Sequence, residues 1–551
     1  MLAKTAFFEM LRDRDIRYVF GNPGTTELSF MEMFADYPDI TYVLGLHDAV
    51  PVGMAYGYAL AAGTPSVVNL HITPGLANGL SNTFNAYRGK IPLIVTAGQV
   101  DRRMTLQDHT LWSDLVRLAS PFTKWAYEAR TGADIPLALA RAFALSQAPP
   151  AGPVFLALPM DCLDEEVDGP APWIRIEAAT RPSPTVLEMI VAALSAARGP
   201  VLIVGSGAAT PDARAALVRI AEDTGARVYG ERLPVRSVFP TDHPQYLGMI
   251  GFSLSELRTE LKDADVVVLA GARKFASLLY TPPVRLRENT IVIHVDTDPW
   301  EIGKNIPTAL GVVGDATAIF TEVARTVSDR MTPSSRETAA ARAAGVRRER
   351  ARREEEWRRA ATLPAPGERM THACAYRIVG ESMDDTVTIV DEAITAARII
   401  DRYVPFRTER AYLGVAAGSL GLGLPASLGA QMAWPERRVI CTIGDGSLMY
   451  AVTALWTAAR YNVPVTVLVL DNREYQILKS GMETYKGGPV PPERLIGMDL
   501  RAPIVDIPRV AQGFGVSARL VTEPSELADA LAERPAGPRL LDVLVRGESG
   551  T

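Results

Sequence analysis

Short apolar runs alternate with amphipathic segments along almost the whole chain, and this alternation restricts the fold more than any other feature. In the first third the runs are IRYVFG, ITYVLGL, PSVVNLHI, IPLIVTAG and PVFLALP, each bounded by Gly, Pro or Asn. Nearly continuous apolar runs are typical of strands buried on both faces of a sheet, and the segments between them are long enough for crossover helices. The pattern predicts parallel α/β layers.

The same alternation returns twice. A second set of runs comprises PVLIVGSGA, ARVYG, ADVVVLAGA and NTIVIHVD, and a third comprises VTIVDE, RVICTIGDGS, PVTVLVLDN and PRLLDVLV. A chain of 551 residues is too long for one hydrophobic core. The sequence therefore predicts an α/β fold of three doubly wound parallel-sheet domains, expected at residues 1–165, 185–330 and 366–551.

Two stretches between these domains have a different composition. Residues 164–184 are rich in proline and charge, which is typical of a linker. Residues 334–370 are mostly Arg, Glu and Ala. This second stretch predicts a solvated helix with ion pairs four residues apart, in preference to a binding segment.

Composition excludes several classes of function. The formal net charge of −6 argues against a nucleic-acid partner and an anionic membrane surface. Cys162, Cys374 and Cys441 lie far apart, so neither a disulfide framework nor a cysteine zinc site is expected. The charged N-terminus is unlike a signal peptide, and no apolar stretch is long enough to span a membrane. We expect a soluble cytoplasmic protein.

The strongest chemical signal is the segment 443–475, IGDGSLMYAVTALWTAARYNVPVTVLVLDNREY. A strand ends in Gly-Asp-Gly-Ser, a helix follows, and a second strand ends in Asp-Asn. Ligands of open parallel sheets bind beyond the carboxyl ends of the strands. Asp445 and Asn472 offer two hard oxygens there, a sparse set that suits Mg²⁺ completed by diphosphate and water. The alternative is an ordinary Gly-Asp-Gly turn, but the strand before each half of the motif disfavours it.

This motif resembles the diphosphate–magnesium motif of the thiamine diphosphate-dependent enzymes. The likeness extends over nearly the whole chain and includes GNPGTTEL, NLHITPGLANGLSN, PLIVTAGQ, AAGSLGLGLPASLGAQ and ALWTAARYNVP. Within that superfamily of 2-oxo acid decarboxylases and acetolactate synthases, the chain is most similar to the benzoylformate decarboxylases. The resemblance implies a pyrimidine-binding N-terminal domain, a Rossmann-like middle domain and a diphosphate-binding C-terminal domain.

The resemblance also assigns residues of the C-terminal domain. It implies that the side chains of Asp445 and Asn472 bind Mg²⁺, together with the backbone carbonyl at Glu474. Leu420 matches the apolar wedge that bends the cofactor, and Glu392 matches an acid near it. The implied cofactor-binding set is completed by Gly418, Gly444, Gly446, Ser447, Tyr475 and Ile477.

Asp48 is the acid that the resemblance places against N1′ of the cofactor's aminopyrimidine. The next charged residue after it is Arg88, so it stands at the start of a long uncharged stretch. A carboxylate there promotes the imino tautomer that forms the thiazolium ylid. The usual residue is glutamate, one methylene longer. Asp48 could instead act as a helix N-cap, and the two roles could coexist.

The substrate side rests on fewer residues. His71 matches a catalytic histidine of the benzoylformate decarboxylases, and Thr25 stands where these have a serine that contacts the substrate carboxylate. The second catalytic histidine of these enzymes aligns near Leu278, so this chain lacks it. His109 is a possible substitute. Ile477 should narrow the pocket on one side.

Gly481 stands where these enzymes have a bulky aromatic residue, so the pocket should be wider on another side.

The middle domain carries VGSGAAT, half of a dinucleotide fingerprint. Because this partial match is weak, we expect no NAD or FAD there, although FAD occupies that domain in the acetolactate synthases.

The resemblance favours a carboxy-lyase that decarboxylates a benzoylformate-like 2-oxo acid to an aldehyde through an enamine. The alternatives are a carboligase that forms a 2-hydroxyketone, as acetolactate synthase does, and a non-catalytic relative that retains the cofactor site. Family sites lie between two subunits, so a homodimer is the expected minimum and a homotetramer the expected assembly.

Overall fold

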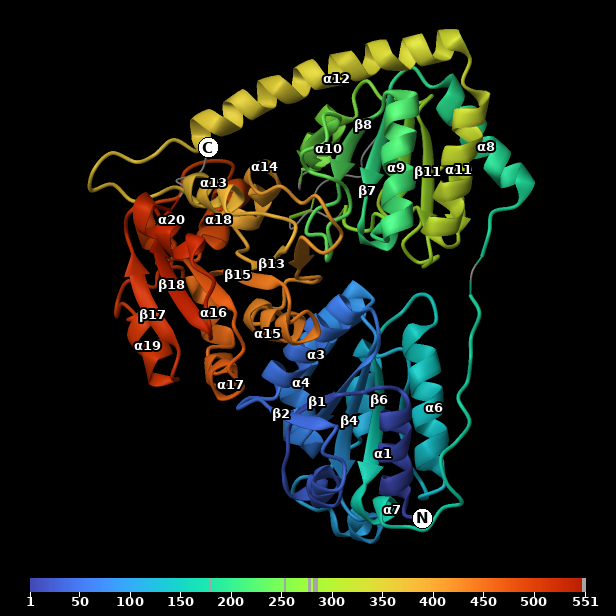
Figure 1. Ribbon diagram of the computed structural model, residues 1–551, viewed down its shortest axis with the longest axis vertical. Coiled ribbons are helices and arrows are strands. Elements are labelled where there is room, and N and C mark those ends of the chain that lie inside the picture. Colours follow the sequence, from blue (N-terminus) through green and yellow to red (C-terminus); the bar gives the residue numbers. More distant parts are fainter. Residues whose placement is uncertain (179, 252–253, 276–278, 281–285, 548–551) are drawn as a thin grey trace.

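A computed structural model describes the chain except residues 179, 252–253, 276–278, 281–285 and 548–551 (Figure 1). The described residues form three sheets, each of six parallel strands, with helices packed on both faces. The three-domain α/β prediction is confirmed. Among the helices described, none combines the length and the apolar character needed to cross a bilayer.

The N-terminal sheet has the strand order β2-β1-β3-β4-β6-β5. Its strands are β1 (Tyr18–Asn22), β2 (Thr41–Leu44), β3 (Ser66–Leu70), β4 (Leu93–Gln99), β5 (Ala126–Glu128) and β6 (Val154–Pro159). Its helices are α1 (Ala3–Asp13), α2 (Leu28–Met31), α3 (Ala49–Ala62), α4 (Ile72–Gly89), α5 (Leu115–Ala119), α6 (Asp134–Gln147) and α7 (Met160–Leu163). Strands β3, β4 and β6 are buried at every residue because helices cover both faces.

The middle sheet has the order β12-β11-β10-β7-β8-β9, which is the doubly wound Rossmann arrangement. Its strands are β7 (Pro200–Val204), β8 (Arg227–Gly230), β9 (Tyr246–Met249), β10 (Val266–Ala270), β11 (Ile291–Asp296) and β12 (Leu310–Val313). Its helices are α8 (Pro184–Ala196), α9 (Pro211–Thr224), α10 (Leu254–Glu260) and α11 (Ala316–Arg330). Ser183, Thr210 and Asp315 each cap the helix that follows with a side-chain oxygen.

The C-terminal sheet, β14-β13-β15-β16-β18-β17, repeats the order of the N-terminal sheet strand for strand. Its strands are β13 (Val387–Glu392), β14 (Tyr412–Gly414), β15 (Arg438–Gly444), β16 (Thr466–Asp471), β17 (Ser517–Val521) and β18 (Arg539–Leu544). Its helices are α13 (His372–Glu381), α14 (Ile400–Tyr403), α15 (Gly423–Ala433), α16 (Asp445–Tyr450), α17 (Ala454–Arg460), α18 (Gln476–Lys486), α19 (Ile507–Gly513) and α20 (Pro524–Ala532). Short 3₁₀ turns are η1 (Thr25–Glu27), η2 (Glu32–Ala35), η3 (Arg102–Gln107), η4 (Ser120–Phe122), η5 (Ser206–Ala208), η6 (Ala396–Arg398) and η7 (Pro492–Arg494).

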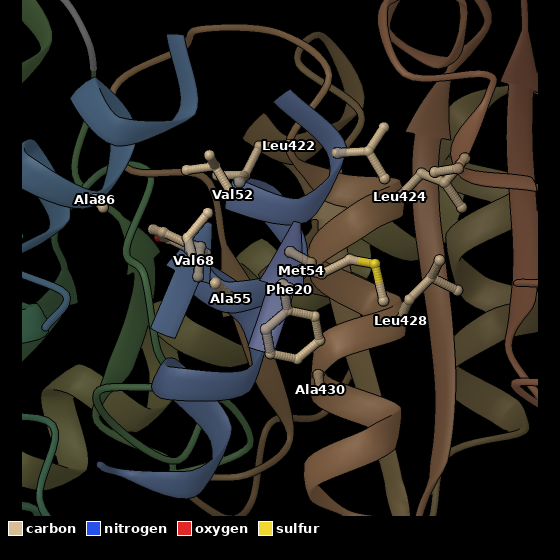
Figure 2. Packing of buried hydrophobic residues seen from close by; sticks show 14 of the residues in the cluster. Phe20, Val52, Met54, Ala55, Val68, Ala86, Leu422, Leu424, Leu428 and Ala430 are labelled. Carbon is tan, nitrogen blue, oxygen red and sulfur yellow. The ribbon is translucent and has the colours of Figure 1, made fainter. Parts of the chain in front are cut away.

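The N- and C-terminal domains share one hydrophobic core, built where α3 packs on α15 (Figure 2). Met54 and Phe20 from the first domain meet Leu424 and Leu428 from the third. The two helices approach backbone to backbone, since a Cβ on Gly57 would lie 1.9 Å from the carbonyl oxygen of Ala426. Both helices join the second and third strands of their sheets, so the two domains pair through equivalent elements.

The stretch rich in Arg, Glu and Ala forms α12 (Pro333–Ala360), a helix of 28 residues that runs from the middle to the C-terminal domain (Figure 1). Its outer side carries pairs four residues apart, such as Arg352 with Glu356. The helix is not solvated all round, however. Arg350 donates to the carbonyl of Tyr246 at 2.7 Å, and Arg353 donates to the carbonyl of Leu247 at 3.0 Å, so one side binds strand β9.

Candidate active site

Asp445 and Asn472 follow the adjacent, paired strands β15 and β16. Oδ2 of Asp445 accepts from the backbone N–H of Arg473 at 2.9 Å, and Oδ1 of Asn472 accepts from the N–H of Glu474 at 3.0 Å. Burial, reinforced by the neighbouring carboxylate of Asp471, raises the pKa of Asp445 to about 7. Two acids brought this close at a strand edge fit a cation, which would remove the repulsion between them.

The glycines beside Asp445 leave room for a ligand to approach the backbone. A Cβ on Gly446 would lie 2.5 Å from Cε1 of Tyr475, so only glycine fits under that ring. Gly444 and Ser447 line the same cavity as Gly446. The Glu474 side chain is held in ion pairs with Lys479 and Arg501, which leaves the backbone as its means of contacting a metal.

Glu392 fixes the loop that carries Gly418 and Leu420. Its two carboxylate oxygens accept from the N–H groups of Gly421 at 2.7 Å and Gly423 at 2.6 Å. Burial raises the pKa of Glu392 to about 7. The acid therefore holds the loop just before α15, and Gly418, with φ of +75°, adopts the left-handed conformation that favours glycine.

These residues line one cavity of about 700 Å³ between the C-terminal and middle domains. The sequence-predicted residues along it are Gly418, Leu420, Gly444, Asp445, Gly446, Ser447, Asn472, Glu474, Tyr475 and Ile477. Glu392 lies behind the wall, and Gly481 is not among the described residues that line it. No sequence motif pointed to the rest of the lining. It includes Arg88 at the end of α4 and Glu231, Arg273 and Lys274 from the middle domain.

A second cluster lies beyond the carboxyl ends of β1, β2 and β3 in the N-terminal domain. Asp48 is 5% exposed, and its Oδ2 accepts from Asn78 at 3.3 Å. Its Oδ1 is buried without a hydrogen-bond partner among the described residues. Asp48 occupies the N-cap position of α3 but makes no side-chain cap hydrogen bond. The capping role is therefore not realised, and one carboxylate oxygen is left for a further donor.

His71 is held by a carboxylate that the sequence reasoning did not single out. Nδ1 of His71 lies 2.8 Å from Oε2 of Glu27 and 3.2 Å from the hydroxyl of Thr26. Glu27 is 1% exposed and also accepts from the backbone N–H groups of Gly24 and Gly98, at 2.8 and 2.9 Å. The available sequence signal was a charged residue three positions after Gly24 at the end of a strand, the spacing of a capping box.

Thr25 and His109 lie in loops around this cluster. Thr25 is exposed at the start of η1. The hydroxyl of Thr73, near the start of α4, bonds to the carbonyl of Leu111 at 2.6 Å, which ties the loop that carries His109 to the helix that His71 begins. Leu278, the position aligned with a second histidine, lies outside the described residues.

The two clusters do not meet within one chain. Asp48, His71, Thr25 and His109 are not among the described residues that line the cavity of the C-terminal domain.

The partial dinucleotide fingerprint of the middle domain is used for packing. A Cβ on Gly205 would lie 2.4 Å from Cα of Ala272, so this glycine allows the β7 and β10 loops to touch. The N–H of Ser206 donates to Glu231 at 2.6 Å, as does its hydroxyl. A carboxylate here repels the phosphate that a dinucleotide would bring to this turn.

One further acidic group follows strand β6 of the N-terminal domain. Asp161, Cys162 and Glu165 are close enough to share an ion. Both carboxylates, however, form ion pairs with Arg102. Their charge is already compensated, so this group is structural.

Comparison with known proteins agrees with this geometry. Three family profiles match: the N-terminal TPP-binding, central, and C-terminal TPP-binding domains of thiamine pyrophosphate enzymes, over residues 1–117, 187–323 and 394–543. Benzoylformate decarboxylase of Pseudomonas aeruginosa is 31% identical over 97% of each chain. Acetolactate synthase isozyme 3 large subunit of Escherichia coli is 28% identical over 95% of this chain and 90% of its own.

Two solved structures are similar to this chain over 99% or more of its length. A thiamine diphosphate-dependent 4-hydroxybenzoylformate decarboxylase of Rhodococcus jostii has a TM-score of 0.86 and 29% identity over 100% of both chains. Benzoylformate decarboxylase of Polynucleobacter necessarius has a TM-score of 0.87 and 27% identity over 99% of both chains. With all three domains matched along the length of the sequence, the chain belongs to the family of thiamine pyrophosphate-dependent enzymes.

Proposed function

We propose that this protein decarboxylates a benzoylformate-like 2-oxo acid to an aldehyde. The observation that carries the proposal is the cavity where Asp445 and Asn472, at adjacent strand ends, face the loop of Gly418 and Leu420. Relatives that match end to end include benzoylformate decarboxylases. When bound, thiamine diphosphate supplies the nucleophilic carbon and the electron sink for this chemistry.

The C-terminal domain would hold the diphosphate through Mg²⁺. Asp445 and Asn472 provide side-chain oxygens and Glu474 its backbone carbonyl, while Gly444, Gly446 and Ser447 leave space for the phosphates. The raised pKa of Asp445 supports this assignment, because a cation favours the ionised carboxylate.

The N-terminal domain would supply the acid and base groups. Asp48 would use its unpartnered Oδ1 to hold a proton against the pyrimidine ring, in a site from which water is excluded. His71, oriented by Glu27, would present its other ring nitrogen to the substrate, and Thr25 and His109 would contribute from the surrounding loops. Because Asp48 does not line the cavity of its own chain, we propose a homodimer as the smallest active unit and a homotetramer as the assembly.

Three buried cysteines without disulfides fit the reducing cytoplasm that we propose as the compartment.

Carboligation to a 2-hydroxyketone is the second candidate function. It is favoured by the acetolactate synthase relatives and by leucine in place of histidine at position 278, which weakens the supply of protons.

The test is turnover by the enzyme loaded with thiamine diphosphate and Mg²⁺, using benzoylformate or pyruvate, alone and with an acceptor aldehyde. Free aldehyde as the main product supports decarboxylation, whereas a 2-hydroxyketone supports carboligation. Cofactor binding without turnover of these acids or of the dicarboxylate 2-oxoglutarate would contradict both functions.

A further inference from the structure

The cavity is also lined by cations that differ in how their charge is compensated. Arg273 donates twice to Asp296, at 2.8 and 3.0 Å. Lys304 forms an ion pair with Glu301. Each of these side chains therefore has its own carboxylate.

Lys274 and Arg88 line the same cavity but have no such carboxylate among the described residues. The ammonium of Lys274 donates to a backbone carbonyl, that of Leu233. Arg88, at the last turn of α4, is exposed toward the cavity and has no acidic side chain within ion-pair distance in the described part of the chain. Lys274 and Arg88 thus line the cavity without an ion pair to any carboxylate of the described residues.

The surroundings of Lys274 make its charge costly. Burial, assisted by the charges of Arg273 and Arg88, lowers the pKa of Lys274 to about 8. The charge of Glu231 favours the ammonium form of Lys274. The oxygens of Glu231, however, already accept from Ser206 and from the backbone N–H of Arg273. A bound anion would offset this cost.

The reacting end of the substrate does not suit this anion. An ion pair to the carboxylate that departs as CO₂ is stronger before the reaction than in the transition state, so it would slow the reaction. The diphosphate would be bound through Mg²⁺ held by Asp445 and Asn472, which line the cavity from the C-terminal domain. What remains is an anionic group that stays on the substrate throughout.

We infer that Lys274 and Arg88 form an anion subsite that selects 2-oxo acids with a second anionic group at the end remote from the reacting carbonyl. The inference rests on the proposed function, since it names the substrate class of that same cavity. A carboxylate is the simplest such group, and a phosphonate has the same charge chemistry.

The first test compares matched substrates with the enzyme loaded with thiamine diphosphate and Mg²⁺. We expect kcat/KM for 2-oxoglutarate to exceed that for 2-oxopentanoate, which lacks the second carboxylate, by about tenfold or more. The 4-phosphono analogue of 2-oxobutanoate distinguishes a carboxylate site from a phosphonate site. Equal or faster turnover of the uncharged-tail substrate would overturn the inference while leaving the proposed function intact.

The second test uses variants. Lys274→Met should reduce the preference for the dicarboxylate about tenfold, mainly through KM, and Lys274→Arg should restore much of it. Lys304→Met is the matched control, since Lys304 lines the same cavity but is paired with Glu301. If Lys304→Met changes the preference as much as Lys274→Met, the effect comes from the overall positive charge of the cavity. The proposed subsite would then be refuted.

A binding measurement separates failure of the inference from failure of the proposed function. Glutarate and pentanoate are titrated into the loaded enzyme by calorimetry. Tighter binding of glutarate that Lys274→Met abolishes supports the subsite even if no 2-oxo acid is turned over. Equal binding of both acids to the wild type and to Lys274→Met contradicts the subsite, whatever the enzyme's activity.

Discussion

At the scale of single residues, Asp48 and Glu27 show two uses of a buried acid. Glu27 is saturated with donors and fixes a histidine, so its charge is compensated within the domain. Asp48 has one satisfied oxygen and one buried oxygen without a partner. An unsatisfied buried carboxylate oxygen costs stability, and such a cost is retained where a ligand completes the site.

Asp48→Asn should lower kcat by at least about 100-fold, because the amide keeps the shape of the side chain but cannot hold the proton that the cofactor ring needs. Asp48→Glu retains the carboxylate and should lose less. Steady-state kinetics with a turned-over 2-oxo acid, together with cofactor titration, checks both variants. Wild-type kcat in Asp48→Asn would show that the acid has no catalytic role.

Glu27→Gln should lower kcat about tenfold, since His71 loses the carboxylate that orients its ring. The matched comparison is the same change in a His71→Ala background, where we expect no further loss. If Glu27→Gln is equally harmful in both backgrounds, Glu27 acts through the fold and not through His71.

At the scale of elements, the close crossing of α3 and α15 depends on glycine. Gly57→Ala places a methyl group against the backbone of Ala426, so the two helices must separate. We expect a loss of about 2 kcal/mol or more in unfolding free energy and a lower melting temperature. Gly345→Ala, in α12, is the control, since a Cβ there would meet only Nη2 of Arg348, at 3.9 Å, and it should stabilise by about 0.5–1 kcal/mol. Equal melting temperatures for both variants would contradict the tight crossing.

Strand β13 contains an acid whose ionisation opposes folding. Asp391 is 2% exposed, and burial raises its pKa to about 6 despite hydrogen bonds from Thr442 and Tyr412. The folded chain therefore holds this proton where the unfolded chain has released it, and stability falls as the pH rises from about 4 to 6.

Asp391→Asn removes this dependence. Relative to wild type, the variant should gain about 2 kcal/mol between pH 4 and pH 7. Melting temperatures of both proteins across this range check the sign. A constant difference between them would mean that the pKa of Asp391 is the same in the folded and unfolded chains.

The sequence predicted the inner strands of all three sheets but missed β5, β9, β12, β14 and β17, each at a sheet edge. These strands are three to five residues long. In β12 and β17 most side chains are exposed or half-buried, because an edge strand has fewer neighbours to pack against. Without a buried apolar run, the pattern that reveals a central strand is absent.

The candidate site was predictable to a similar degree. Asp445 and Asn472 follow apolar strands directly and stand beside glycines or another acid, so their placement follows from the sheet. Lys274 and Arg88 come from a different sheet and from the end of a long helix. Their approach to the cavity depends on how three domains pack, which no local pattern specifies.

At the scale of the whole molecule, the separation of the two clusters predicts complementation. Asp48→Ala and Asp445→Ala should each be inactive alone, because each removes one half of the site. Refolded together, they should regain up to about a quarter of wild-type activity, since half of the dimers are mixed and each mixed dimer has one intact site. No recovery in mixtures shown to contain mixed dimers would mean that each chain builds its own site.

The first and third domains are held together by their shared core, although they are not consecutive along the chain. The polypeptide reaches the third domain only by way of the stretch 164–184, the middle domain and α12 (Figure 1). The contact between α3 and α15 bypasses that route entirely (Figure 2). A protease that cuts within 164–184 would therefore leave two fragments that migrate together under native conditions and separate in denaturant. The same reasoning makes this stretch the natural position for new chain ends in a circularly permuted enzyme.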